Sequence, residues 1–250
     1  MAIDLNADVG ESFGDWRTDD AAILRLVTSA SVACGGHCGD ADSMRRTVDL
    51  AAENGVTVGA HVSYADREGF GRRVVDLAPG ALTDLVASQT LALQDAAAGA
   101  GTAVRYVKPH GALYNRVVRD TAQAQAVARG IGLSGLDLAV VTLPGSELAR
   151  AADEAGLTVV GEAFLDRAYE DDGSLVPRTE PDAVLHDIGE IASRGVDLAL
   201  RGSIVARSGV RLRVDARTLC LHGDTDGAVG LLAAVRTALV ESGVELRAFA

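Results

Sequence analysis

Short apolar runs alternate with longer Ala- and Leu-rich stretches along nearly the whole chain, and this alternation limits the folds open to it. The short runs have the length of strands and are apolar almost throughout, as strands buried on both faces are. Strands joined in turn by helices form a parallel sheet with helices over its faces. The predicted strands are residues 3–7, 31–34, 56–60, 104–107, 136–141, 157–161 and 218–221.

The longer stretches carry the start and stop signals of helices. Asp40 and Asp42 stand in capping positions before one stretch, and Gly55 follows its end. The predicted helices are roughly residues 18–28, 40–54, 80–100, 119–130, 145–155, 182–194 and 225–242.

Two segments interrupt the repeat. Residues 165–180 are rich in charge, Gly and Pro and predict a long loop, whereas residues 203–214 predict a hairpin that turns near Ser208 and Gly209. No linker or low-complexity tract divides the chain, so we predict one domain over residues 1–250. The β/α units fit either a closed barrel or an open doubly wound sheet.

The balance of charge excludes some partners. The formal net charge of −12 argues against binding to nucleic acid or to an anionic membrane through bulk electrostatics. The acidic start of the chain and the lack of a long apolar run predict a soluble, cytoplasmic protein. Cys34, Cys38 and Cys220 are expected to be reduced thiols that pack, since the stretch from Cys34 to Cys38 lacks the second ligand pair of a zinc site.

Four of the five histidines end or closely follow a predicted strand, and each has a glycine within two residues. They are His37, His61, His110 and His222, whereas His186 lies in a predicted helix and is interpreted as incidental. The ends of the strands in a β/α repeat converge on one rim. Histidine is the side chain best suited to proton transfer or metal binding near neutral pH. The four positions therefore predict one polar site.

Charged side chains accompany the first and fourth predicted strands. Asp4, Asn6 and Asp8 share one face of the first strand, where burial is costly unless they are paired or face a wet cavity. They indicate a constellation in a barrel lumen or at its rim, and the alternative is a helix cap with a surface turn. Lys108 at the end of a buried strand needs a carboxylate or a ligand beside its ammonium group.

Two further positions have both a functional and a structural interpretation. Arg72 or Arg73 has a guanidinium that can clamp a carboxylate at two points, and the alternative is a solvated charge cluster. Asp224 either belongs to the site with His222 or caps the helix that follows.

Together these segments resemble the LamB/YcsF family, in order from residue 3 to about residue 229. Where that family has Asn, Phe and Pro, this chain has Ser31, Gly36 and Val62, so the pocket is expected to differ in shape or bonding there. The matching segments are DLNADVGE (4–11), ACGGH (33–37), GAH (59–61), VKPHGALYN (107–115), EAFLDRAY (162–169), DGSLVPR (172–178) and HGDT (222–225).

The resemblance implies an irregular seven-stranded β/α (TIM-like) barrel of the glycoside hydrolase and deacetylase type. It also implies ATP-dependent opening of 5-oxo-L-proline to L-glutamate, carried out with separate B and C subunits and with ATP bound as its Mg complex. No standard nucleotide-binding motif is present in the sequence, so the partners are expected to supply part of the ATP contacts. Self-association of the chain stays open.

Such chemistry needs a base for water and cations beside developing negative charge. The residues predicted to be catalytic are Asp8, His61, Lys108 and His110. The residues predicted to bind substrate are Asn6, Glu11, His37, Arg72, Tyr114, Asn115, His222 and Asp224.

Two other functions remain open at this point. Asp8 and His61 are suitable ligands for a divalent metal, which would fit a stand-alone metal-dependent deacetylase or amidohydrolase. The third interpretation is a binding or scaffold protein without catalytic groups.

Overall fold

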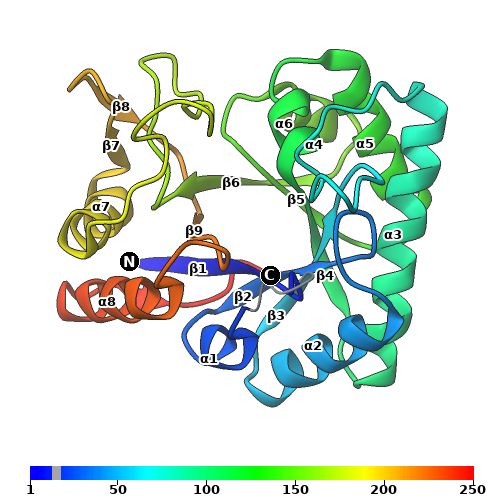
Figure 1. The fold of residues 1–250 in the computed structure, drawn as a ribbon, viewed down its shortest axis with the longest axis horizontal. Helices are drawn as coiled ribbons and strands as arrows, with labels where there is room; N and C mark the ends of the chain where they lie inside the picture. Colours follow the sequence, from blue (N-terminus) through cyan, green and yellow to red (C-terminus); the bar gives the residue numbers. More distant parts are fainter. Residues whose placement is uncertain (13–17) are drawn as a thin grey trace.

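The computed structural model describes residues 1–12 and 18–250, and its parallel strands close into a barrel (Figure 1). Each barrel strand pairs with its neighbour in parallel, and the β1–β9 pair closes the ring. A further strand, β10 (Glu245–Leu246), pairs with the start of β1. The barrel strands are β1 (Ala2–Val9), β2 (Ser29–Ala33), β3 (Thr57–Val62), β4 (Val104–Pro109), β5 (Ala139–Thr142), β6 (Thr158–Phe164) and β9 (Thr218–Cys220).

Helices cover the outside of the barrel. Figure 1 shows α7 and α8 side by side on one flank and α2, α3 and α5 on another. The caps match the sequence: Asp40 accepts a hydrogen bond from Ser43 N at 2.8 Å, a cap typically worth about 1 kcal/mol. The helices are α1 (Asp20–Leu24), α2 (Ala41–Glu53), α3 (Pro79–Gly99), α4 (Gly111–Val117), α5 (Thr121–Leu133), α6 (Glu147–Glu154), α7 (Ile188–Arg201) and α8 (Ala228–Glu241).

The seven-stranded β/α barrel is confirmed, but several predicted boundaries are wrong. The helix predicted over 182–194 begins at Ile188, where Asp187 caps it, and runs on to Arg201. The helix predicted over 18–28 is confined to α1, because the chain is already extended in β2 from Ser29. Helix α4 is absent from the prediction because Pro109 and Gly111 are typical helix breakers.

The two irregular segments agree with the sequence. Residues 165–180 contain no regular helix or strand, and they form a loop beyond β6. The hairpin predicted over 203–214 consists of β7 (Ser203–Val205) and β8 (Arg211–Arg213), which pair in antiparallel.

The strands place polar side chains inside the barrel and apolar ones outside. Along β1, Leu5, Ala7 and Val9 belong to the apolar core that packs against the helices. Asp4, by contrast, accepts hydrogen bonds from Ser29 Oγ on the neighbouring strand β2, at 2.7 Å, and from Thr218 on the neighbouring strand β9. Because a buried polar group is costly without a partner, the barrel lumen is held together by hydrogen bonds and ion pairs.

Across residues 1–12 and 18–250, no helix combines the length and the apolar character that a membrane span requires.

Candidate active site

A cavity of about 550 Å³ lies at the carboxyl ends of the barrel strands. All of the site residues predicted from the sequence line it except Asn6 and His37. Asn6 lies deeper in the lumen, and His37 is fully buried behind the cavity wall. The side chains that do line it include Asp8, Glu11, His61, Arg72, Lys108, His110, Tyr114, Asn115, His222 and Asp224.

Lys108 occupies the floor of the cavity and is 1% exposed. Its Nζ lies 2.9 Å from Asp8 Oδ1 and 2.9 Å from Glu162 Oε1. It also donates to Asn6 Oδ1 at 3.3 Å and to Cys220 Sγ at 3.1 Å. Burial alone would lower the pKa of Lys108, but the charges of Asp8, Cys220 and Glu162 outweigh burial and hold it well above the usual value.

Lys108 is also the only lysine in the sequence, since every other basic side chain among the 23 Lys and Arg residues is arginine. A compact ammonium group can meet several converging acceptors, whereas a planar guanidinium needs a wider fork. The sequence therefore held a stronger signal for Lys108 than its strand-end position alone.

Asp8 joins Lys108 to the histidines. Its Oδ2 lies 3.3 Å from His61 Nε2, while His61 Nδ1 donates to the Lys108 carbonyl oxygen at 3.0 Å. Burial lowers the pKa of His61, but the attraction of Asp8 outweighs it, and the pKa is raised. Burial likewise raises the pKa of Asp8, but His61 and Lys108 hold it well below its usual range. Asp8 is thus an ion that orients two cations.

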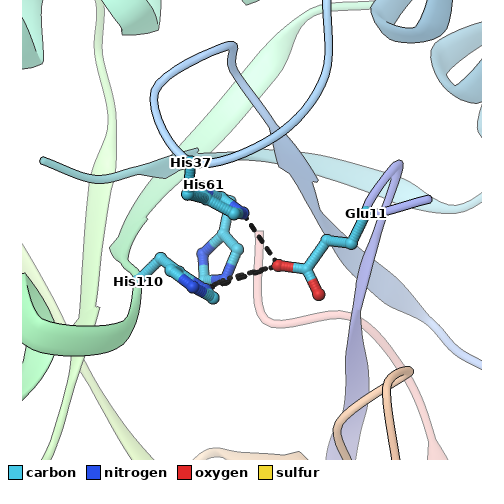
Figure 2. Close-up of side chains that lie close together, drawn as sticks. All are labelled: Glu11, His37, His61 and His110. Carbon is cyan, nitrogen blue, oxygen red and sulfur yellow. Dashed lines mark hydrogen bonds and ion pairs between the residues drawn. The ribbon is translucent and has the colours of Figure 1, made fainter. Parts of the chain in front are cut away.

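Three imidazoles converge on the carboxylate of Glu11 (Figure 2). Glu11 Oε1 lies 2.9 Å from His37 Nε2, 3.4 Å from His110 Nδ1 and 3.7 Å from His61 Nε2. The rings of His37 and His110 are stacked, with centroids 3.7 Å apart. We call these four residues, Glu11, His37, His61 and His110, the histidine cluster.

The outer ring nitrogens of the cluster are already committed as donors. His110 Nε2 donates to Phe70 O at 2.9 Å, as His61 Nδ1 does to the carbonyl of Lys108. Ser63 Oγ donates to a backbone carbonyl, so it accepts from His37 Nδ1 at 3.0 Å. The second nitrogen of each ring therefore turns inward, toward Glu11.

Shared protons join the inward-facing ring nitrogens of the histidine cluster to one another and to the Glu11 carboxylate. Burial and then the charge of Asp8 raise the pKa of Glu11 to about 8, so a protonated Glu11 donates to His37 Nε2. Burial, reinforced by the neighbouring imidazoles, lowers the pKa of His37 and of His110 well below the usual value. His61 Nε2 carries the proton that it shares with His110 Nδ1 at 3.0 Å. His37 and His110 are therefore neutral, and an imidazole must be neutral to bind a metal ion.

The far wall of the cavity carries a second histidine with a carboxylate partner. His222 Nδ1 lies 2.9 Å from Asp166 Oδ1, and its ring stacks on Phe164. Burial raises the pKa of Asp166, but His222 and Thr225 outweigh it and lower that pKa to about 2. Asp166 was not predicted as a site residue, although it stands in one of the segments that suggested the family.

The rim of the cavity brings together the remaining predicted residues. Arg72 forms a hydrogen-bonded ion pair with Asp224, so the two side chains singled out separately in the sequence neutralise each other. Tyr114 packs edge-on against Phe164. Within the described ranges, Tyr114 Oη and Glu162 Oε2 are buried without a hydrogen-bond partner. Whether these residues bind substrate stays a prediction.

Comparison with known proteins identifies the family. The sequence pattern of the LamB/YcsF family matches residues 3–250. This chain belongs to the LamB/YcsF family. A relative from Streptomyces avermitilis, named as the A subunit of 5-oxoprolinase, is 57% identical to this LamB/YcsF chain over 249 residues, which cover 99% of the chain and 100% of the relative.

Solved structures agree with the barrel of this LamB/YcsF chain. The crystal structure of the lactam utilization protein from Thermus thermophilus matches it with a TM-score of 0.94 at 42% identity, covering 100% of both chains. A polysaccharide deacetylase from Bacillus cereus matches with a TM-score of 0.50 at 12% identity, covering 100% of this chain and 92% of the other. The second likeness concerns the fold alone.

One expected departure of this LamB/YcsF chain has a structural explanation. A Cβ added to Gly36 would lie 2.4 Å from Ser63 Oγ and 2.9 Å from the Gln89 amide. Gln89 Nε2 donates to Ser63 O at 2.8 Å, and Ser63 in turn holds His37. The space beside Gly36 is therefore filled by the residues that orient His37.

Proposed function

We propose that this chain is the lactam-opening component of an ATP-dependent 5-oxoprolinase. It would bind 5-oxo-L-proline and, with separate B and C subunits and MgATP, yield L-glutamate. One observation carries the proposal: a buried Lys108–Asp8–His61 chain joins the histidine cluster at the floor of the cavity, in a sequence 57% identical to a protein named as the A subunit of 5-oxoprolinase.

The reaction consists of one phosphoryl transfer to the lactam oxygen, followed by two attacks of water. The lactam oxygen takes the terminal phosphoryl group of ATP, and ADP leaves. Water then adds to the carbon, and the ring C–N bond breaks as the nitrogen takes up a proton, which gives γ-glutamyl phosphate. A second water releases phosphate and glutamate. Each step needs a proton acceptor, a proton donor and positive charge near the developing anion.

The floor of the cavity offers these groups. Asp8 is fixed by Lys108 at 2.9 Å and holds His61 in one orientation, which prepares His61 and His110 to pass a proton. Lys108 supplies a permanent positive charge beneath the reacting carbon. On the opposite wall, Asp166 accepts from His222 Nδ1, so His222 Nε2 is left to act as a base for water.

The histidine cluster also fits a divalent transition metal. Three imidazole nitrogens and a carboxylate oxygen lie within 4.8 Å of one another, and the outer nitrogens are oriented by fixed acceptors. Asp8, which the sequence paired with His61 as a ligand, stands beside this set. A bound metal would supply Lewis acidity toward the lactam oxygen. A bound cation would also take the place of the proton that now neutralises the buried carboxylate of Glu11.

We expect purified chain equilibrated with Zn²⁺ or Mn²⁺ to retain one ion. His37→Ala should weaken metal affinity by at least about 100-fold. Loss of a residue that only hydrogen-bonds to a metal ligand already costs about 10- to 100-fold, and loss of the ligand itself costs more. Elemental analysis after dialysis and metal titration measure both. His186→Ala is the matched control, since His186 is exposed and outside the cluster. Equal retention by both variants would rule out the cluster as the metal site.

The function is tested by reconstitution. Glutamate and ADP should form from 5-oxoproline and ATP when the chain is combined with its candidate B and C subunits, and not with the chain alone. Amino-acid analysis and a coupled ADP assay follow the two products in parallel. A complete assembly that consumes no 5-oxoproline would overturn the proposal.

The histidine cluster also supports a second candidate, a metal-dependent deacetylase or amidohydrolase that acts without partners. Release of acetate from an N-acetylated sugar by the chain alone, abolished by a chelator, would favour it over lactam opening.

A further inference from the structure

The cavity wall contains two arginines that the function proposed above does not use. Arg167 and Arg178 both come from the loop beyond β6 and both line the cavity. The sequence suggested neither as a site residue. Their surroundings separate them from the other arginines of this cavity.

Arg167 is held rigidly but keeps one end of its guanidinium free. It is 5% exposed, and it donates from Nε to Ala183 O at 3.2 Å and from Nη2 to Val176 O at 2.6 Å. Its Nη1 makes no hydrogen bond, and no carboxylate pairs with the side chain, within residues 1–12 and 18–250. Burial, and after it the charge of Arg178, lower the pKa of Arg167 to about 10.

Arg178 lines the same cavity as Arg167, and it is exposed. In the part of the chain that the structure describes, it forms neither an ion pair nor a hydrogen bond. The two remaining arginines of the cavity are neutralised: Arg72 pairs with Asp224, and Arg119 lies 2.9 Å from Asp172. Arg167 and Arg178 are thus two arginines of one cavity, in a chain with a net charge of −12, that form no ion pair within the described residues.

Among the described residues, the floor of the cavity offers no unpaired lysine or arginine. Lys108 is the cation there, and its charge is already shared between Asp8 and the neighbouring Glu162. A small anionic ligand is therefore attracted more strongly to the arginines on the wall, which have no carboxylate partner in the described part of the chain, than to the paired lysine at the floor. A guanidinium with unused N–H groups binds a carboxylate strongly and directionally.

We propose that Arg167 and Arg178 form an anion subsite that binds the carboxylate of the cyclic amide acid. Such a subsite would turn the lactam amide of the substrate toward Lys108 and the histidine cluster. The inference rests on the proposed function for the identity of the ligand. The arginine pair would thus select 5-oxoproline over lactams without an acid group.

The test compares 5-oxoproline with 2-pyrrolidinone, the same ring without the carboxylate. Chemical-shift titration of the full chain measures affinities into the millimolar range for both ligands. Arg178→Gln should weaken 5-oxoproline binding by about 10- to 100-fold, the usual value of a charge-assisted hydrogen-bond pair. Binding of 2-pyrrolidinone should be unchanged, and Arg178→Lys should recover part of the loss.

Arg178 is the cleaner position because it is exposed, whereas Arg167→Gln also removes bonds to two backbone carbonyls of its loop. Arg45→Gln, on the exposed face of α2, controls for the change in net charge. Unchanged 5-oxoproline binding in Arg178→Gln, or equal losses for the two ligands, would overturn the proposal. Loss of inorganic phosphate binding with 5-oxoproline unaffected would assign the pair to a phosphoryl group and overturn it as well.

Steady-state kinetics of the assembled enzyme separate this inference from the function on which it rests. If glutamate forms and Arg178→Gln leaves KM for 5-oxoproline unchanged, the subsite is wrong and the function stands. The titration can also show that binding of the 5-oxoproline carboxylate depends on Arg178 while no glutamate forms with any set of partners. In that case the subsite stands and the function is wrong. We expect glutamate formation together with a KM about 10- to 100-fold higher in the variant.

Discussion

Replacing Lys108 with methionine is expected to lower the free energy of unfolding by about 3–5 kcal/mol, the typical cost of removing one partner of a buried ion pair. Asp8 and Glu162 each lie 2.9 Å from Nζ, and both side chains are almost completely buried. Methionine fills a similar volume but leaves Glu162 without its counterion and Asp8 with His61 alone. Urea denaturation followed by circular dichroism measures the change.

A second substitution separates the charge effect from packing. Glu162→Gln in the Lys108→Met background should recover part of the lost stability, because it removes the carboxylate that has lost its counterion. Arg45→Gln, whose pair with Asp42 is exposed, should change the free energy of unfolding by less than about 1 kcal/mol. A similarly small loss in Lys108→Met would mean that the carboxylates are protonated or hydrated, and not held by the lysine.

His61→Ala is expected to lower kcat/KM of the assembled enzyme by about 10²- to 10⁴-fold, the range of a lost general acid or base. His61 links Asp8 to His110 and lies at the centre of the histidine cluster. Its removal therefore breaks the route for protons and takes one donor from the cluster. Initial rates of glutamate formation at several concentrations of 5-oxoproline give the ratio.

His186→Ala is the matched control for this variant, and its rates should equal those of the unaltered chain, since His186 is exposed on a loop before α7. Thermal unfolding of the His61→Ala chain checks that the barrel is intact. Full activity in a folded His61→Ala chain would favour the scaffold interpretation, in which a partner protein carries the reacting groups.

The sequence predicted the barrel strands well, because each has its own apolar run. Closure of the barrel depends on the pairing of β1 with β9, whose residues Asp4 and Thr218 are far apart in the chain. No local pattern encodes such a pairing, and the resemblance to a family supplied it. The start of α7 was misplaced because the polar stretch before Ile188 contains residues that suit a helix as well as a loop.

The same limit applies to the site. Strand-end positions brought His61, His110 and Lys108 together correctly, since the end of a parallel strand has a known place. His37 was predicted to bind substrate, yet a tight turn, in which Gly35 N donates to Cys38 O at 2.7 Å, carries it into contact with Glu11. Arg167 was not singled out because its free guanidinium end is visible only once its loop has folded.

A chain with a single lysine contains a natural spectroscopic probe at the centre of its barrel. Growth on isotopically labelled lysine would place one side-chain signal in the spectrum, with no assignment to make and no substitution to introduce. That signal reports from within hydrogen-bond distance of Asp8, Asn6 and Cys220. Substrate entry, metal loading and assembly with partner proteins would each be measured at the same atom, in the unaltered protein.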